Sequence, residues 1–353
     1  MNIYRLGDTG PEVAEIQERL LRRGAQIDPG ELLGRFEHST EAAVRKFQAD
    51  RHLSVDGVVG PDTWGQLVDA GWQLGDRALY FRQSPFRGDD VVGLQRKLNA
   101  LGFDAGREDG VFGSATDRAV RAFQRNVGQQ ADGIVGPGTL VTLDRLRPQA
   151  DAQSRAVVRE EESLRDLRTD LVGAIVAIDP GHGLEDGGFT GPGGTAEGDL
   201  TFSMAAALAD ELSALGAKPA LLRDEHENPT PSDRARLANE LEAAACVSFH
   251  VNSGPPGASG PTVYYFGSSS THSPMGMRLA ELILDELARA IGSPGTCERL
   301  TVSLLRETAM PAVQVEPVFI SNPSEEPKLS DPEFRVRVAR AVAAGMSRFF
   351  MRE

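Results

Sequence analysis

The sequence is poor in cysteine and in basic residues, and both shortages exclude classes of protein. Only two cysteines occur among 353 residues, which excludes a disulfide framework and a four-cysteine metal site. Lysine and arginine total 37 against 51 acidic residues, giving a formal net charge of −14. This balance argues against a nucleic-acid partner, because phosphate backbones are bound mainly by clustered basic side chains. We expect Cys246, in the apolar run "AAACVSFHVN", to be buried and Cys297 to lie in a loop.

Long apolar runs are also missing. No segment approaches the roughly 18 consecutive apolar residues that would span a bilayer. The first residues, "MNIYRLGDTGPEVAEIQERL", lack the basic stretch and apolar core of a Sec signal peptide. We therefore expect no transmembrane segment and a cytoplasmic location, with export or release by a non-Sec route as the alternative. The length leaves room for two or three domains.

The first half of the chain contains an internal repeat. "VAEIQERLLRRG" and "GRFEHSTEAAVRKFQADRHLSVDGVVGPDTWGQL" in the first copy correspond to "VVGLQRKLNALG" and "GVFGSATDRAVRAFQRNVGQQADGIVGPGTLVTL" in the second. Apolar residues at helical spacing predict three short helices in each copy, and the proline of each Gly-Pro-x-Thr element suits the first turn of the third helix. The matching positions are Gln17 and Gln95, Phe36 and Phe112, and the Phe-Gln pairs at 47–48 and 123–124.

This repeat resembles the peptidoglycan-binding-domain-1 family over residues 6–70 and 87–145. The resemblance implies two small all-α modules, assigned to residues 1–72 and 80–147, that bind cell-wall glycopeptide. The pattern residues also have a simpler interpretation, since they specify the fold and do not by themselves establish binding. For Phe47 and Phe123 we favour a place in the core.

The second half has a different pattern, after a charged linker at residues 148–172 that we expect to be partly a solvated helix. Strands and amphipathic helices alternate from residue 173 to 353, which predicts an α/β domain with a mostly parallel sheet covered by helices on both faces. The expected strands are 175–178, 218–222, 247–251, 262–266 and 313–320. The expected helices are 200–215, 232–245, 275–290 and 332–350.

Three motifs of this domain place a metal-binding or proton-transferring residue at or near a strand end. They are "IDPGHG" with His182, "VSFHVNS" with His250 and "VQVEPVFISN" with Glu316, and Glu197 stands just ahead of an expected helix. Two histidines and a glutamate form a common ligand set for catalytic zinc that leaves a fourth position for water. A further glutamate suits the general base that takes the proton of that water.

Each of these residues also has an ordinary interpretation. A histidine at a loop corner is usually exposed or hydrogen-bonded, and Glu197 is also a suitable first-turn acid at a helix N-terminus. Glu316 is harder to explain in this way, because a carboxylate within an apolar strand costs several kcal/mol unless it is paired or bound to a metal. Four such groups directed to strand ends favour a functional site.

Residues 174–350 resemble the zinc-dependent N-acetylmuramoyl-L-alanine amidases of the amidase-3 type. The matching pieces are "IDPGHG", "AEGDLT", "LLRD", "SDRARLAN", "SFHVNS" and "LLRETAMPAVQVEPVFISNPSE". The resemblance implies that His182, Glu197 and His250 bind zinc and that Glu316 is the catalytic glutamate. It also implies hydrolysis of the amide bond between N-acetylmuramic acid and L-alanine of the stem peptide.

Two positions depart from the family pattern, which has glycine two residues after the catalytic glutamate and after "DPGHG". Val318 and Leu184 occupy these places here, and we expect a β-branched Val318 to crowd the substrate. Two functions follow from these observations. One is a cell-wall hydrolase whose modules bind peptidoglycan. The other is a cytosolic regulator on an amidase scaffold, which senses muropeptide or precursor fragments and contacts a protein of cell-wall precursor synthesis.

Overall fold

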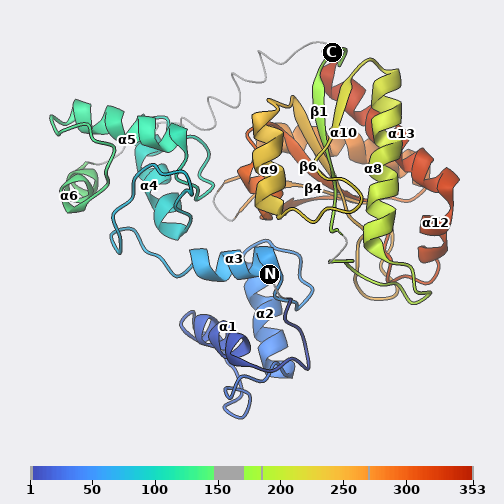
Figure 1. Ribbon diagram of the computed structural model, residues 1–353, viewed down its shortest axis with the longest axis horizontal. Coiled ribbons are helices and arrows are strands. Elements are labelled where there is room, and N and C mark those ends of the chain that lie inside the picture. Colours follow the sequence, from blue (N-terminus) through green and yellow to red (C-terminus); the bar gives the residue numbers. More distant parts are fainter. Residues whose placement is uncertain (1–2, 147–170, 184–185, 269–270, 352–353) are drawn as a thin grey trace. The chain divides into compact units, whose positions relative to one another are not determined.

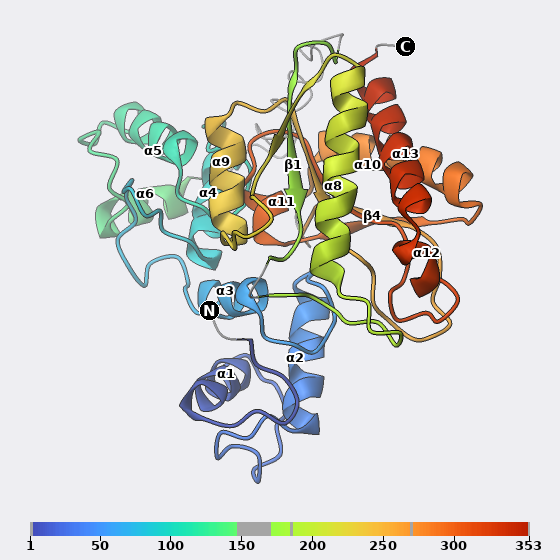
Figure 2. The ribbon, with the colours of Figure 1, turned by 45° about the vertical axis from the view of Figure 1, so that its right-hand side comes forward.

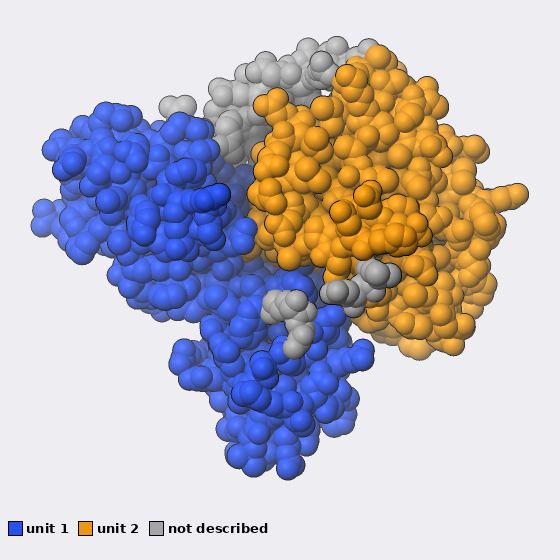
Figure 3. Space-filling model, in the orientation of Figure 1, with its two compact units in different colours: residues 1–165 blue, residues 166–353 orange. Residues whose placement is uncertain are grey.

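The structure is a computed structural model that describes residues 3–146, 171–183, 186–268 and 271–351. Its chain forms two compact units, residues 1–165 and residues 166–353 (Figure 3). The expected linker helix within residues 148–172 lies almost wholly outside the described residues, as does Leu184. No helix in the described part of the chain is both long and apolar enough to cross a membrane.

Unit 1 contains the two repeats, and each folds as three described helices around its own apolar core (Figure 1). The expected core residues Phe47 and Phe123 are 7% and 0% exposed. Pro61 and Pro137 stand at the first position of the third helix, as expected. The helices are α1 Pro11–Leu21, α2 His38–Asp50, α3 Pro61–Asp69, α4 Asp89–Ala100, α5 Ser114–Asn126 and α6 Pro137–Arg145.

Buried glutamines of the repeat pattern form hydrogen bonds to the loops of each module. In the second module the Nε2 group of Gln124 donates to Asp132 Oδ1 at 2.8 Å and to the Ile134 carbonyl at 3.0 Å. Its Oε1 accepts the Gly133 backbone N–H at 2.9 Å. Gln48 makes the equivalent bonds to Asp56, Val58 and Gly57 in the first module. The side-chain amide thus replaces water for loop backbone groups that would otherwise be buried without partners.

Unit 2 is built on a six-stranded sheet with the strand order β2-β1-β3-β6-β4-β5. All neighbouring strands are parallel except β4 and β6, which pair antiparallel with Thr262 opposite Glu316. The central strands β1, β3 and β6 are almost completely buried, as expected when helices cover both faces. The strands are β1 Ile175–Pro180, β2 Lys218–Leu221, β3 Ala245–Phe249, β4 Thr262–Phe266, β5 Thr296–Leu300 and β6 Ala312–Glu316.

Helices cover the two faces of this sheet unequally (Figure 2). The larger core lies between the sheet and the long helices α8 Glu197–Ala214, α10 Pro274–Ile291 and α13 Pro332–Phe350. The smaller core lies on the other face, under α9 Pro231–Glu240 and the short α11 Ser303–Glu307. A further short helix, α12 Glu326–Ser330, precedes α13.

The expected fold class is confirmed. The errors of the sequence analysis concern single elements and their ends. The sequence analysis missed β5, α11 and α12, and it placed Cys297 in a loop whereas the residue lies in β5. The exposed, charged sequence of β5 lacks the apolar run of a central strand, because β5 is an edge strand. The last strand ends at Glu316, four residues before the expected end. Cys246 is fully buried as expected.

Gln124→Ala tests the role of the pattern glutamines. The substitution leaves the loop groups of the second module without partners, so we expect a loss of roughly 1–3 kcal/mol in the unfolding free energy of that module. The measurement is hydrogen exchange in the full-length protein, read at the peptides of α4 to α6 across a urea series. Arg125→Ala, an exposed neighbour on α5, is the control. Equal protection in the two variants would contradict a structural role for Gln124.

Candidate metal and catalytic site

The carboxyl ends of three adjacent strands bring the site together. The strands β1, β3 and β6 are neighbours in that order, and all three run in the same direction. His182 lies two residues beyond the end of β1, His250 follows the last residue of β3, and Glu316 is the last residue of β6. Glu197 is the first residue of α8, so the start of this helix lies over the same edge. Groups separated by up to 134 positions in the sequence thus share one edge of the sheet.

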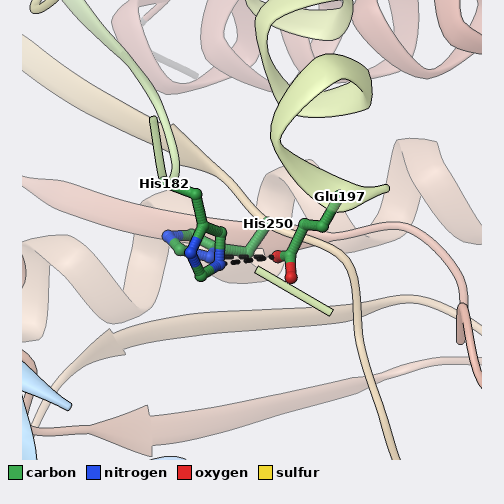
Figure 4. Close-up of side chains that lie close together, drawn as sticks. All are labelled: His182, Glu197 and His250. Carbon is green, nitrogen blue, oxygen red and sulfur yellow. Dashed lines mark hydrogen bonds and ion pairs between the residues drawn. The ribbon is translucent and has the colours of Figure 1, made fainter. Parts of the chain in front are cut away.

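His182, Glu197 and His250 form a compact cluster (Figure 4). Their potential ligand atoms all lie within 4.8 Å of one another. Glu197 Oε1 lies 3.1 Å from His182 Nε2 and 3.3 Å from His250 Nδ1. One carboxylate oxygen therefore faces both imidazole rings, and the sequence-based expectation that these three side chains lie together agrees with the geometry.

Electrostatics in this cluster favour a bound positive charge. Burial by itself would disfavour the ionised form of Glu197, but the charge and hydrogen bonds of His182 and His250 move its pKa well below the usual range. Burial likewise opposes a charged His182, but the carboxylates of Glu197 and Asp186 overcome it and raise the pKa of His182 to about 10. The protein without metal therefore holds a proton where the negative charge of the cluster requires a cation.

The carboxylate of Glu197 is fixed by backbone groups. It is 1% exposed, and it accepts the Val251 N–H at Oε1 and the Phe189 N–H at Oε2, both at 2.9 Å. The loop that carries Phe189 comes so close that a Cβ on Gly188 would lie 2.5 Å from Glu197 Oε2. Only glycine fits there, also because its φ is +69°. The carboxylate therefore has one orientation in the cluster.

Asp186 is a part of the site that the sequence analysis missed. Its Oδ2 lies 3.0 Å from His182 Nδ1, on the side of the ring away from Glu197. A carboxylate on the second nitrogen fixes the tautomer and orientation of a ligand histidine and raises its basicity. The only signal in the sequence was an acid four residues after His182 in the same loop.

Glu316 lies outside the three-residue cluster, but the charges of the cluster influence its pKa. The carboxyl group is 7% exposed, and Oε1 accepts a hydrogen bond of 2.7 Å from Gln314 Nε2. Burial raises the pKa of Glu316 to about 8, with Glu197 adding to the shift while Gln314 and His182 oppose it. A carboxyl group that titrates near neutral pH is suited to accept and return a proton in a reaction.

The cluster fits zinc in both chemistry and spacing. Two imidazole nitrogens and one carboxylate oxygen are the donors of many catalytic zinc sites, which leave the fourth position open. Zinc bonds of about 2.0–2.1 Å in a tetrahedron separate ligand atoms by about 3.4 Å. The observed separations of 3.1 and 3.3 Å from Glu197 Oε1 are close to this spacing, and the three ligand atoms all lie within 4.8 Å of one another. His182, Glu197 and His250 could therefore hold the ion after an adjustment of their side chains.

The expectation for Val318 is corrected by its position. Its side chain is 0% exposed and packs in the larger core with Val251, Val315 and Ile320. A side chain that is completely buried in the core is not available to contact a substrate, so the expectation of crowding is wrong.

The raised pKa of Glu316 predicts a pH-dependent stability. Between its usual value and about 8, the folded protein keeps a proton that the unfolded chain has released. The unfolding free energy of metal-free unit 2 should therefore fall as the pH rises through this window, by on the order of a few kcal/mol. Glu316→Gln should remove the fall at acidic pH and reduce it near neutral pH, where His182, whose raised pKa of about 10 also keeps a proton in the folded protein, contributes the remainder.

The measurement is hydrogen exchange of β3 and β6 peptides in urea, at about pH 5 and about pH 8. Glu281→Gln, which removes an exposed carboxylate from α10, is the control. The assignment fails if Glu316→Gln and Glu281→Gln show the same dependence on pH.

Known protein families match both halves of the chain. A family model described as N-acetylmuramoyl-L-alanine amidase matches residues 176–348, and a peptidoglycan-binding-domain model matches residues 9–67 and 87–143. The N-acetylmuramoyl-L-alanine amidase CwlM of Mycobacterium tuberculosis is 35% identical over 362 residues, covering 98% of this chain and 89% of CwlM. The germination-specific N-acetylmuramoyl-L-alanine amidase of Bacillus subtilis is 30% identical over 206 residues, covering 54% of this chain and 85% of the relative.

A similar solved structure is that of the amidase AmiC2 of Nostoc punctiforme, at 30% identity and a TM-score of 0.47, covering 51% of this chain and 98% of that one. The two family models, which match the two parts of the chain independently, confirm both resemblances found in the sequence. The chain belongs to the N-acetylmuramoyl-L-alanine amidase family, with two peptidoglycan-binding repeats ahead of the amidase domain.

Proposed function

We propose that this protein is a zinc-dependent peptidoglycan amidase that hydrolyses the bond between N-acetylmuramic acid and L-alanine of the stem peptide. His182, Glu197 and His250 hold the metal, and Glu316 is the general base. The observation that carries the proposal is the convergence of the three ligand side chains, whose donor atoms lie within 4.8 Å of one another, in a site whose charges also act on the buried carboxyl group of Glu316.

The chemistry divides between the ion and this chain. Bound zinc supplies a Lewis acid that polarises the amide carbonyl and lowers the pKa of a water molecule. Glu316 accepts a proton from the attacking water, whose oxygen forms the new bond to the carbonyl carbon. The C–N bond then breaks, and Glu316 returns the proton to the leaving nitrogen. The products are the lactyl carboxylic acid and the free amino terminus of L-alanine, so atoms and charge balance.

The environment of Glu316 supports both proton transfers. An exposed glutamate with an ordinary pKa is a weak base at neutral pH and a poor source of protons. Burial raises the pKa of Glu316 to about 8, and a cation bound nearby lowers it again by favouring the carboxylate. These opposed influences keep the group near the working pH, where general acid–base catalysis is most efficient.

The two repeats would hold the enzyme on its polymer. Linking weak binding modules to a catalytic domain raises the local concentration of substrate through multivalency. An enzyme that cuts this polymer acts at the cell wall, so we propose the exported or released location considered in the sequence analysis instead of the cytoplasmic one. The alternative of a cytosolic regulator is not favoured, because the described residues of unit 2 keep all four side chains that the reaction needs and bring His182, Glu197 and His250 together.

Glu316→Gln separates chemistry from metal binding. We expect turnover to fall about 10²- to 10⁴-fold, the usual contribution of a general base, while zinc stays bound in equal amount. His250→Ala should lose both zinc and turnover. The measurements are new L-alanine amino termini released from purified peptidoglycan, and zinc content by mass spectrometry. Undiminished turnover in Glu316→Gln would sink the catalytic assignment.

Val318→Ala tests the corrected position of this residue. Because the side chain is in the core, the substitution should lower the unfolding free energy by roughly 1–3 kcal/mol and leave kcat/KM unchanged at temperatures where the variant is folded. Thermal unfolding and amidase assays measure the two effects. A rise in kcat/KM would mean that Val318 does obstruct the substrate.

A further inference from the structure

The turn that carries His182 has an unusual backbone. His182 is one of three described residues other than glycine with a positive φ, at +60°. This left-handed conformation is unfavourable for a residue that carries a β-carbon. It persists only where surrounding contacts impose it. The contacts around residues 180–182 therefore decide where the imidazole of His182 points.

Every carbonyl of this turn accepts a hydrogen bond from a side chain of another element. The Pro180 carbonyl accepts from Arg223 Nε at 2.8 Å and from Arg234 Nη1 at 3.0 Å. The Gly181 carbonyl accepts from Thr201 Oγ1 at 2.7 Å and from Arg223 Nη2 at 3.3 Å. The His182 carbonyl accepts from Arg234 Nη2 at 2.7 Å. Three consecutive peptide groups are thus fixed by Arg223, Arg234 and Thr201.

The neighbouring strand fixes the same turn from the other side. The Gly181 N–H donates to the Phe249 carbonyl at 2.9 Å, immediately before His250. A Cβ on Gly181 would lie 2.5 Å from His250 Nε2 and closer still to the Phe249 carbonyl, so only glycine allows this approach. This backbone hydrogen bond joins the residue before His182 to the residue before His250, so it fixes the positions of the two histidines relative to each other.

Both arginines are buried, which is costly without compensation. Arg223 and Arg234 are 3% and 5% exposed. Arg234 pairs with the buried carboxylate of Asp179 at 3.0 Å, and Ser248 donates to the second oxygen of that carboxylate at 2.6 Å. Burial and the charge of Arg234 lower the pKa of Arg223, and the charges of Asp179 and Glu225 oppose this shift. Two adjacent buried cations must be offset by ion pairs and hydrogen bonds, and the bonds to residues 180–182 supply part of this.

We propose that Arg223 and Arg234 are positioning residues, which bind the carbonyls of residues 180–182 and so hold His182 in its metal-binding orientation. The inference rests on the proposed function, and it adds to that function a role for residues that touch neither metal nor substrate. Arginine is required because its planar group directs several N–H donors at fixed angles. A lysine at position 234 cannot reach the Pro180 carbonyl, the His182 carbonyl and Asp179 together.

The experiment uses Arg234→Lys and Arg223→Lys in the full-length protein, which keep the charge but lose the fork of donors. Zinc affinity is measured by competition with a chromophoric chelator, and ligand geometry by the visible absorption of the cobalt(II)-substituted protein. We expect zinc affinity to fall about 10- to 100-fold, the usual effect of removing a group that orients a ligand. The cobalt bands should change in position or intensity.

Two further variants complete the test. Arg236→Lys lies on the same helix, but its side chain is exposed and pairs with Asp233 and Glu240, so it should leave affinity and spectrum unchanged. Thr201→Val removes the hydroxyl that lies 2.7 Å from the Gly181 carbonyl and 2.9 Å from the Gly198 carbonyl of its own helix, and leaves both arginines in place. This variant should weaken zinc binding several-fold in a folded protein. It tests the same turn if a lysine variant does not fold.

The outcomes separate the two proposals. If the wild type binds zinc and the folded lysine and valine variants match it in affinity and spectrum, the positioning role is wrong, even if their stability falls. If the wild type binds neither zinc nor cobalt at these residues, the proposed function fails and this inference fails with it. Weaker binding confined to Arg223→Lys, Arg234→Lys and Thr201→Val supports the role.

Discussion

The buried carboxylate of Glu197 determines much of the architecture of unit 2. A charge that is 1% exposed must be balanced, and its partners come from distant parts of the chain: His182 after β1, His250 after β3 and the backbone N–H groups of Val251 and Phe189. Each partner constrains the element that carries it. The close loop at Gly188 and the fixed position of the start of α8 both follow from this requirement.

The need to balance buried charge also explains the polar groups that surround the site residues. Asp186 binds the Nδ1 atom of His182, and Arg234 binds its carbonyl oxygen. Gln314 donates a hydrogen bond to the carboxyl group of Glu316. A ligand set held only by its own side chains would lose entropy on binding a metal. Here the backbone and the surrounding polar groups have already restricted the side chains, so less ordering remains to oppose binding. The price is a group of buried charges that must stay mutually satisfied.

The repeats of unit 1 solve a different problem, since each is too small to bury much apolar surface. Their cores are supplemented by glutamines whose amides satisfy loop backbone groups, as Gln48 and Gln124 do. This explains why the repeat pattern contains glutamine beside phenylalanine at 47–48 and 123–124. The pattern specifies a fold, and any binding of glycopeptide uses the surface that this fold presents.

By itself, the sequence determined the three-helix repeats and the α/β domain, and it predicted that His182, Glu197 and His250 lie together, because apolar periodicity and motifs at strand ends are local signals. It did not reveal β5, whose exposed residues reflect its place at the sheet edge, nor that Val318 faces the core. The contacts that Asp186, Arg223 and Arg234 make around His182 could not be read from the sequence, because only the tertiary structure brings these side chains to residues 181 and 182. The physical reason is that a hydrogen bond depends on distance and angle in space, whereas spacing along the chain records only which groups share an element.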